Sequence, residues 1–136
     1  MPGYVVGLKD ALRALVVDDE LLIADYIASV LEEAGHTVVG MAATADQALK
    51  LLRETGADVA LLDITLKGAS DGVELARAIR REHRLPYIFI SGSGDPQTRQ
   101  RAEDTNPLAF LQKPFKDAQL LAVLMGVHSS AERDGS

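Results

Sequence analysis

The feature that most constrains the fold is a fivefold alternation of short apolar runs with longer amphipathic segments. The apolar runs are rich in β-branched and aliphatic residues, and they are Leu12–Val17, Thr37–Ala42, Asp58–Leu62, Tyr87–Ile90 and Leu108–Leu111. Runs that are apolar almost throughout favour strands buried on both faces, as in a parallel sheet covered by helices. The sequence therefore predicts an α/β fold of five βα units, with right-handed crossovers that place helices on both faces.

The segments between these runs have the periodicity and end signals of helices. The first, Glu20–Ala34, repeats apolar residues at helical spacing, and Gly35 after it is a common helix stop. Three more helices are predicted at capping signals, which are Thr44 with Gln47, Asp71 with Glu74, and Asp95 before Pro96. The last helix is expected from about Asp117 to Val127, where the apolar pattern ends.

The helix after Asp95 differs from the other four. Its segment QTRQRAED offers Ala102 but no large apolar residue, so it can bury little surface. We expect this helix to be marginally stable or mobile, and to respond to partners.

The chain of 136 residues suits one domain, predicted over residues 11–128. Residues 1–10 would form an N-terminal arm, and the polar segment 129–136 is expected to be a disordered tail. The net charge of −6 argues against direct nucleic-acid binding, which needs clustered cations. The chain has no cysteine for disulfides or thiolate chemistry, and no apolar run suited to membrane insertion. These features predict a cytoplasmic protein.

Polar residues follow the predicted strands, at the points where the strands end. Asp18, Asp19 and Glu20 follow the first, Asp63 the third, Ser91 the fourth and Lys113 the fifth. In an open α/β sheet, ligands bind outside the carboxyl ends of the strands, so these side chains should gather at one edge. Crowded carboxylates need a cation or a proton, and oxygen-only ligands suit Mg²⁺ or Mn²⁺.

Such a set also predicts phosphoryl chemistry. A carboxylate beside the metal ion could accept a phosphoryl group, while the metal and a lysine neutralise the charge on its oxygens. The three histidines, His36, His83 and His128, are expected on the surface and are not placed to serve as ligands.

With these residues in place, the chain resembles the receiver domain of bacterial two-component response regulators, from about Arg13 to Val127. The resemblance rests on four segments in order, which are LVVDDE (15–20), LLDITLKGASDGVELARAIR (61–80), PYIFISG (86–92) and FLQKPF (110–115). It implies a flavodoxin-like three-layer sandwich with strand order 2-1-3-4-5. We expect a single-domain response regulator.

The resemblance also assigns roles to individual residues. It makes Asp63 the phosphoacceptor, and Asp18, Asp19, Asp63 and the backbone carbonyl of Thr65 the Mg²⁺ ligands. Ser91 would be the switch hydroxyl, Phe110 the switch aromatic and Lys113 the phosphate-pairing lysine, followed by a cis peptide bond to Pro114. No organic cofactor is implied.

The resemblance further implies a signalling cycle rather than classical enzyme catalysis. A histidine kinase or histidine phosphotransfer protein would supply the phosphoryl group, and the domain would catalyse only its own phosphorylation and dephosphorylation. The surface of the fourth helix, fifth strand and fifth helix would then change for a downstream protein partner, and in the family it also supports homodimers.

Two alternatives remain open. A degenerate receiver would dock partners without phosphorylation, although the intact set of Asp18, Asp19, Asp63, Ser91 and Lys113 argues against it. A small phosphohydrolase would need an acid–base residue two positions after Asp63, where this chain has Thr65.

Overall fold

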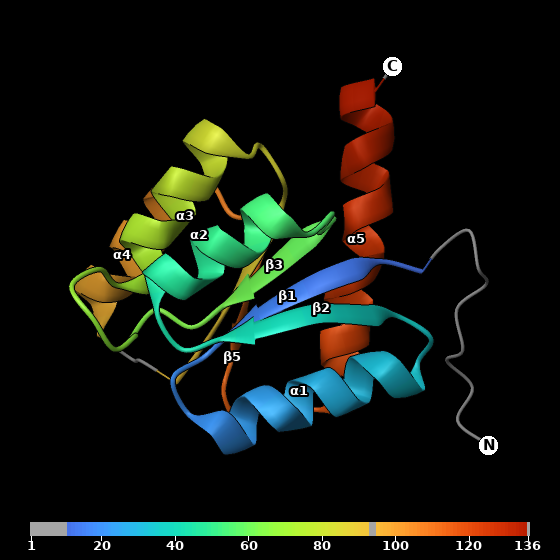
Figure 1. Ribbon diagram of the computed structural model, residues 1–136, viewed down its shortest axis with the longest axis horizontal. Helices are drawn as coiled ribbons and strands as arrows, with labels where there is room; N and C mark the ends of the chain where they lie inside the picture. The colour runs from blue at the N-terminus through green and yellow to red at the C-terminus, as the bar shows by residue number, and fades with distance from the viewer. Residues whose placement is uncertain (1–10, 93–94, 136) are drawn as a thin grey trace.

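Five parallel strands form one sheet with helices on both faces (Figure 1). The computed structural model describes residues 11–92 and 95–135, with those from 128 onward described as backbone. The strands are β1 (Arg13–Val17), β2 (Thr37–Ala42), β3 (Val59–Leu62), β4 (Tyr87–Ser91) and β5 (Ala109–Gln112). Their order, β2-β1-β3-β4-β5, confirms the expected flavodoxin-like α/β sandwich.

Each strand is followed by a helix. The helices are α1 (Leu21–Glu33), α2 (Ala45–Glu54), α3 (Gly72–Glu82), α4 (Pro96–Asp104) and α5 (Asp117–Gly135). Helices α2, α3 and α4 cover one face of the sheet, and α1 and α5 cover the other (Figure 1). Successive strand residues supply the two halves of the core. In β1, Leu15 and Val17 pack toward α2 and α3, whereas Ala14 and Val16 pack toward α1 and α5.

The predicted helix ends are largely confirmed. Asp71 caps α3 in a complete capping box with Glu74, and Asp95 caps α4 ahead of Pro96. Thr44 caps α2 by accepting a hydrogen bond from the Gln47 N–H, but the Gln47 side chain accepts from Ala43 instead of closing a box with Thr44. Gly35, with φ of 103°, ends α1 in a conformation that glycine adopts at low cost.

The end of α5 differs from the expectation. The sequence predicts a helix to about Val127 and a disordered tail over residues 129–136, but the helix continues to Gly135. The apolar pattern stops near Val127, whereas helix formation does not require it, and no Gly or Pro interrupts residues 127–134. The predicted arm at residues 1–10 and the last residue, Ser136, lie outside the described residues.

His36 also differs from the prediction of a surface position. Its side chain is 7% exposed, and its Nδ1 atom accepts a hydrogen bond of 3.0 Å from the Leu12 N–H, just before β1. The sequence around His36 does not predict this contact, because the contact joins His36 to Leu12, which is distant in the chain. Within the described part of the chain, no helix is long and apolar enough to cross a membrane.

Candidate functional site

The acidic residues predicted at the strand ends do meet at one edge of the sheet. β1 and β3 are neighbours, with Val17 opposite Leu62, so the residues that follow each strand lie side by side. Asp18 and Asp63 are buried, at 4% and 6% exposure, while Asp19 is half-buried and Glu20 is exposed. Two carboxylates thus sit in a largely water-excluded site, and two more stand at its mouth.

Lys113 donates a hydrogen bond to each of the two buried carboxylates, Asp18 and Asp63. Its Nζ atom donates to Asp18 Oδ2 at 2.9 Å and to Asp63 Oδ2 at 3.2 Å. The lysine follows β5 and lies 95 positions after Asp18 in the sequence. Burial lowers the pKa of Lys113, but the hydrogen bond to Asp18 and the charges of Asp63 and Asp18 raise it to a net value above normal. The lysine is therefore a firm positive charge in the site.

The balance is different for Asp63. Burial raises the pKa of this carboxyl, Lys113 lowers it and the neighbouring Asp18 raises it, and the net shift is upward. The single lysine thus does not fully offset the cost of burying the Asp63 carboxylate next to Asp18. The site favours a further cation, or a proton, on its carboxylates.

The carboxylates are close enough to share one cation. Ligand atoms of Asp18, Asp19, Glu20 and Asp63 all lie within 4.8 Å of one another. Four carboxylates without nitrogen or sulfur donors suit a hard divalent ion such as Mg²⁺. Glu20 was expected at this edge of the sheet but is not among the predicted metal ligands, and the structure places its carboxylate within reach of the same cation. The predicted role of the Thr65 carbonyl as a metal ligand stays a prediction.

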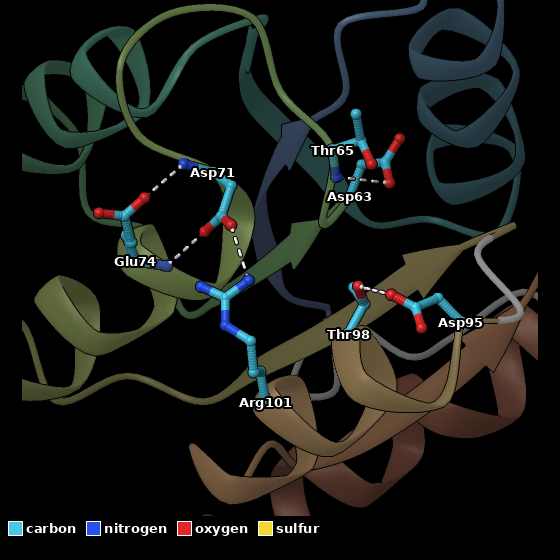
Figure 2. Close-up of polar contacts among 7 residues, drawn as sticks. All are labelled: Asp63, Thr65, Asp71, Glu74, Asp95, Thr98 and Arg101. Carbon is cyan, nitrogen blue, oxygen red and sulfur yellow. Dashed lines mark hydrogen bonds and ion pairs between the residues drawn. The ribbon is translucent and has the colours of Figure 1, made fainter.

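Backbone contacts fix the position of Asp63. Its N–H donates to the Val17 carbonyl at 2.8 Å, and one carboxylate oxygen accepts from the Thr65 N–H at 3.3 Å (Figure 2). The Gly72 N–H, at the start of α3, donates to the Ile64 carbonyl at 2.7 Å. These bonds attach the segment that carries Asp63 to β1 on one side and to α3 on the other.

Gly72 is a positioning residue that the sequence reasoning missed. A Cβ atom at this position would lie 2.0 Å from the backbone oxygen of Asp63 and 2.8 Å from Ile64 Cα. Glycine therefore permits α3 to begin directly against the backbone of Asp63. The only sequence signal is a glycine at the first helical position after a capping aspartate, which is not specific by itself.

Ser91 and Phe110 occupy the neighbouring strands. Ser91 ends β4 and is 2% exposed, and its carbonyl accepts from the Lys113 N–H at 2.9 Å. The half-buried ring of Phe110 packs on the α4 side of the sheet, with its centroid 6.1 Å from that of Phe89. The guanidinium carbon of Arg99 lies 3.8 Å from the Phe110 centroid, a cation–π contact that the sequence did not predict. The Lys113–Pro114 peptide bond is cis, as the resemblance implied.

Comparisons with known proteins agree with this geometry. Residues 14–125 match the family model of the response regulator receiver domain. The nitrogen assimilation regulatory protein NtrX of Azorhizobium caulinodans is 36% identical over 111 residues, which are 80% of this chain and 24% of that protein. The transcriptional regulatory protein PdtaR of Mycobacterium tuberculosis is 28% identical over 112 residues, which are 82% of this chain and 54% of PdtaR. The chain thus spans between about a quarter and about half of these relatives.

Solved structures show the same fold. The signal receiver domain of a modulated diguanylate cyclase from Desulfovibrio desulfuricans superposes with a TM-score of 0.85 at 35% identity, covering 90% of this chain and 98% of that one. The receiver domain of NtrX from Brucella abortus gives a TM-score of 0.78 at 35% identity, covering 86% of this chain and 98% of that one.

Proposed function

Because the chain belongs to the response regulator receiver domain family, we propose that Asp63 is the residue on which it accepts a phosphoryl group in two-component signalling. The observation that supports this assignment best is the pair of hydrogen bonds from Lys113 Nζ to Asp18 and Asp63. They place one fixed positive charge between the proposed nucleophile and a proposed metal ligand, where the charge of a transferred phosphoryl group would develop.

The proposed transfer begins when an Asp63 carboxylate oxygen attacks the phosphorus of the donor. The new O–P bond forms as the N–P bond of a phosphohistidine breaks, and the released imidazole takes a proton. Lys113 neutralises charge on the phosphoryl oxygens. Water later attacks the phosphorus, and the carboxylate and inorganic phosphate are released. In this scheme the domain catalyses only these two steps on itself.

The proposed metal is Mg²⁺, with Mn²⁺ as a substitute. Asp18, Asp19 and Asp63 would hold it together with the Thr65 carbonyl, and Glu20 is near enough to contribute. The ion would supply positive charge that draws the phosphoryl oxygens toward Asp63. The oxygen donor set and the raised pKa of Asp63, caused chiefly by its burial, both fit a site that gains from a divalent cation.

The proposed output is a change at the α4–β5–α5 surface. A phosphoryl group on Asp63 adds negative charge and strong acceptors, which would draw Ser91 and Lys113 toward it. Phe110 could then enter the space that Ser91 leaves, which would alter the surface next to α4. Ser91 and Phe110 lie on adjacent strands, β4 and β5, as this exchange requires.

The proposed partners follow from this cycle. A histidine kinase or histidine phosphotransfer protein would be the phosphodonor, and a protein that binds the α4–β5–α5 surface, or a second copy of the chain, would be the target. We propose the cytoplasm as the site of action and residues 11–128 as the receiver unit.

The test is phosphorylation by acetyl phosphate in the presence of Mg²⁺, followed by intact-protein mass spectrometry. Wild type should gain one phosphoryl group, and Asp63→Asn should gain none. Asp19→Asn should be labelled more slowly at a given Mg²⁺ concentration, because it removes a metal ligand and keeps the nucleophile. The matched control is Asp46→Asn, which removes an exposed carboxylate on α2 and should be labelled like wild type.

Two outcomes would contradict the proposal. Equal labelling of Asp63→Asn and wild type would place the acceptor elsewhere. No labelling of wild type, together with no shift of its amide NMR signals by beryllofluoride, would identify a docking module that works without phosphorylation.

A further inference from the structure

Helix α4 is attached to the rest of the domain mainly by polar contacts. Of its nine residues, all of which the structure describes, Ala102 alone is buried. Burial of one methyl group contributes little to the free energy that holds a helix in place. The position of α4 therefore depends on the hydrogen bonds and charge contacts of its other side chains.

Two arginines of α4 reach its neighbours on either side. Arg101 Nη1 lies 3.1 Å from Asp71 Oδ2, at the start of α3 (Figure 2). Arg99 covers the ring of Phe110 on β5, and its Nε atom donates to Glu103 at 3.1 Å. We call the Arg99–Phe110 and Arg101–Asp71 contacts together the arginine clamp. Both contacts are partly exposed, so each is weak and easily exchanged.

The C-terminal end of α4 is held differently. The carbonyl of Thr105 accepts a buried hydrogen bond of 2.6 Å from the Tyr87 hydroxyl and one of 2.8 Å from Arg80 Nη1. Thr105 itself is 6% exposed, and its hydroxyl donates to the Ala102 carbonyl. Breaking these bonds would leave buried polar groups unpaired, which is costly. The C-terminal end is thus the firmer attachment.

Both partners of the clamp lie next to the proposed phosphorylation site. Asp71 caps α3, whose first residue, Gly72, is bonded to the carbonyl that follows Asp63. Phe110 is the proposed switch aromatic. A displacement at Asp63 or Phe110 would therefore move one of the two groups that the arginines hold.

We propose that α4 is a lever that turns about Thr105, and that the arginine clamp sets its resting position. Release of either arginine frees the Gln97 end of the helix while the Thr105 end stays in place. The part of this inference that makes phosphorylation the trigger rests on the proposed function of Asp63. The lever itself is a property of the fold and can be tested without a phosphodonor.

The test measures two distances by electron spin resonance between pairs of spin labels. The chain has no cysteine, so labels can be attached at introduced cysteines alone. One pair joins Lys50→Cys on α2 with Gln97→Cys near the start of α4, and the other joins Lys50→Cys with Asp104→Cys at its end. Each pair is made in wild type and in three clamp variants, Arg101→Gln, Asp71→Asn and Arg99→Gln.

Asp71→Asn is the most selective of these variants. Asparagine caps helices about as well as aspartate, so α3 keeps its N-terminal hydrogen bond while the charge that faces Arg101 is lost. Arg53→Gln, an exposed arginine on α2, is the matched control. Urea unfolding of every variant checks that the global fold is retained.

Without a phosphodonor, each clamp variant should broaden the distance distribution from Gln97 and leave that from Asp104 at its wild-type width. Wild-type widths in all three variants would overturn the clamp. Equal broadening at both labels would overturn the pivot at Thr105.

Addition of beryllofluoride and Mg²⁺ to wild type tests the trigger separately. The distance from Gln97 should change in wild type and stay constant in Asp63→Asn. If the clamp variants broaden the distribution but beryllofluoride has no effect on wild type, the lever stands and the proposed function of Asp63 fails.

Discussion

Helices α3 and α4 cover the same face of the sheet but are held in place by different means. Six residues of α3 are buried, including Val73, Leu75 and Ile79, and a complete capping box closes its first turn. In α4 the buried set is Ala102 alone, and two arginines make the side contacts. A helix fixed by burial keeps its place under small changes of charge, whereas one fixed by exposed polar contacts can be shifted by them.

The difference corresponds to the position of each helix relative to Asp63. The first residue of α3 lies against the backbone of Asp63, so any movement of α3 would displace the proposed nucleophile. α4 touches Phe110 on β5 and reaches Asp63 indirectly, through Asp71 and Gly72. We therefore infer that α3 holds Asp63 in place and that α4 changes its position when Asp63 is modified.

The substitution with the largest expected effect is Gly72→Ala, which tests whether α3 is fixed against Asp63. The added Cβ would collide with the backbone oxygen of Asp63, so α3 and the Asp63 segment would have to separate. We expect a loss of more than about 3 kcal/mol in the free energy of unfolding, a large share of the stability of a domain of this size. Urea unfolding measures it. Gly56→Ala is the control, because its Cβ would make an ordinary contact at 3.7 Å. Wild-type stability of Gly72→Ala would show that α3 is not fixed against Asp63.

The next test compares a buried position of α3 with an exposed position of α4. Leu75 of α3 is 1% exposed, and Leu75→Ala should lower the free energy of unfolding by about 2–3 kcal/mol through lost burial and a cavity. Gln100→Ala, at an exposed position of α4, should change it by less than about 0.5 kcal/mol. Thermal and urea unfolding of both variants give these values. Similar losses in the two variants would remove the distinction between α3 and α4.

The third test concerns the negative charge of Asp63, whose backbone lies against the start of α3. Burial and the nearby Asp18, opposed by Lys113, raise the pKa of Asp63 in the folded protein. The native state then binds a proton more tightly than the unfolded state, so wild type loses stability as pH rises from about 3.9 toward the higher folded pKa. Asp63→Asn does not ionise and should avoid this loss.

The measurement is urea unfolding of Asp63→Asn and wild type from about pH 4 to 7 without divalent cations. The stability advantage of Asp63→Asn should grow through this window by about 1.4 kcal/mol for each unit by which the pKa is raised, and then level off. Asp46→Asn is the control and should show no such growth. An advantage that does not change with pH would mean that the charge of Asp63 is fully compensated.

The smallest effect on the free energy of unfolding is expected for a substitution in the arginine clamp. Arg101→Gln removes a partly exposed ion pair and should cost less than about 1 kcal/mol of unfolding free energy. The same substitution should nevertheless raise amide hydrogen exchange in α4 while α3 amides keep their protection. Two-dimensional NMR follows both sets of amides at once. Equal exchange in wild type and Arg101→Gln would contradict the assignment of α4 as the weakly held helix.

Local patterns in the sequence were enough to predict most of the fold. Each βα unit carries its own apolar run and helix periodicity, and Thr44, Asp71 and Asp95 mark helix starts within a few residues of chain. The convergence of Asp18, Asp63 and Lys113 was also predictable, because parallel strands bring their carboxyl ends to one edge. The local pattern misplaces the end of α5, because apolar periodicity stops near Val127 while the helix continues to Gly135.

The tertiary structure alone decided the contacts between residues distant in the chain. They include the approach of Gly72 to the Asp63 backbone, the cation–π contact of Arg99 with Phe110 and the burial of His36 against Leu12. No local pattern encodes these contacts, because each depends on how closely two packed elements approach and on where each side chain points. The sequence by itself determined which residues could form a phosphoryl site, and the packing of distant elements decided how closely they meet, as in the hydrogen bonds from Lys113 to Asp18 and Asp63.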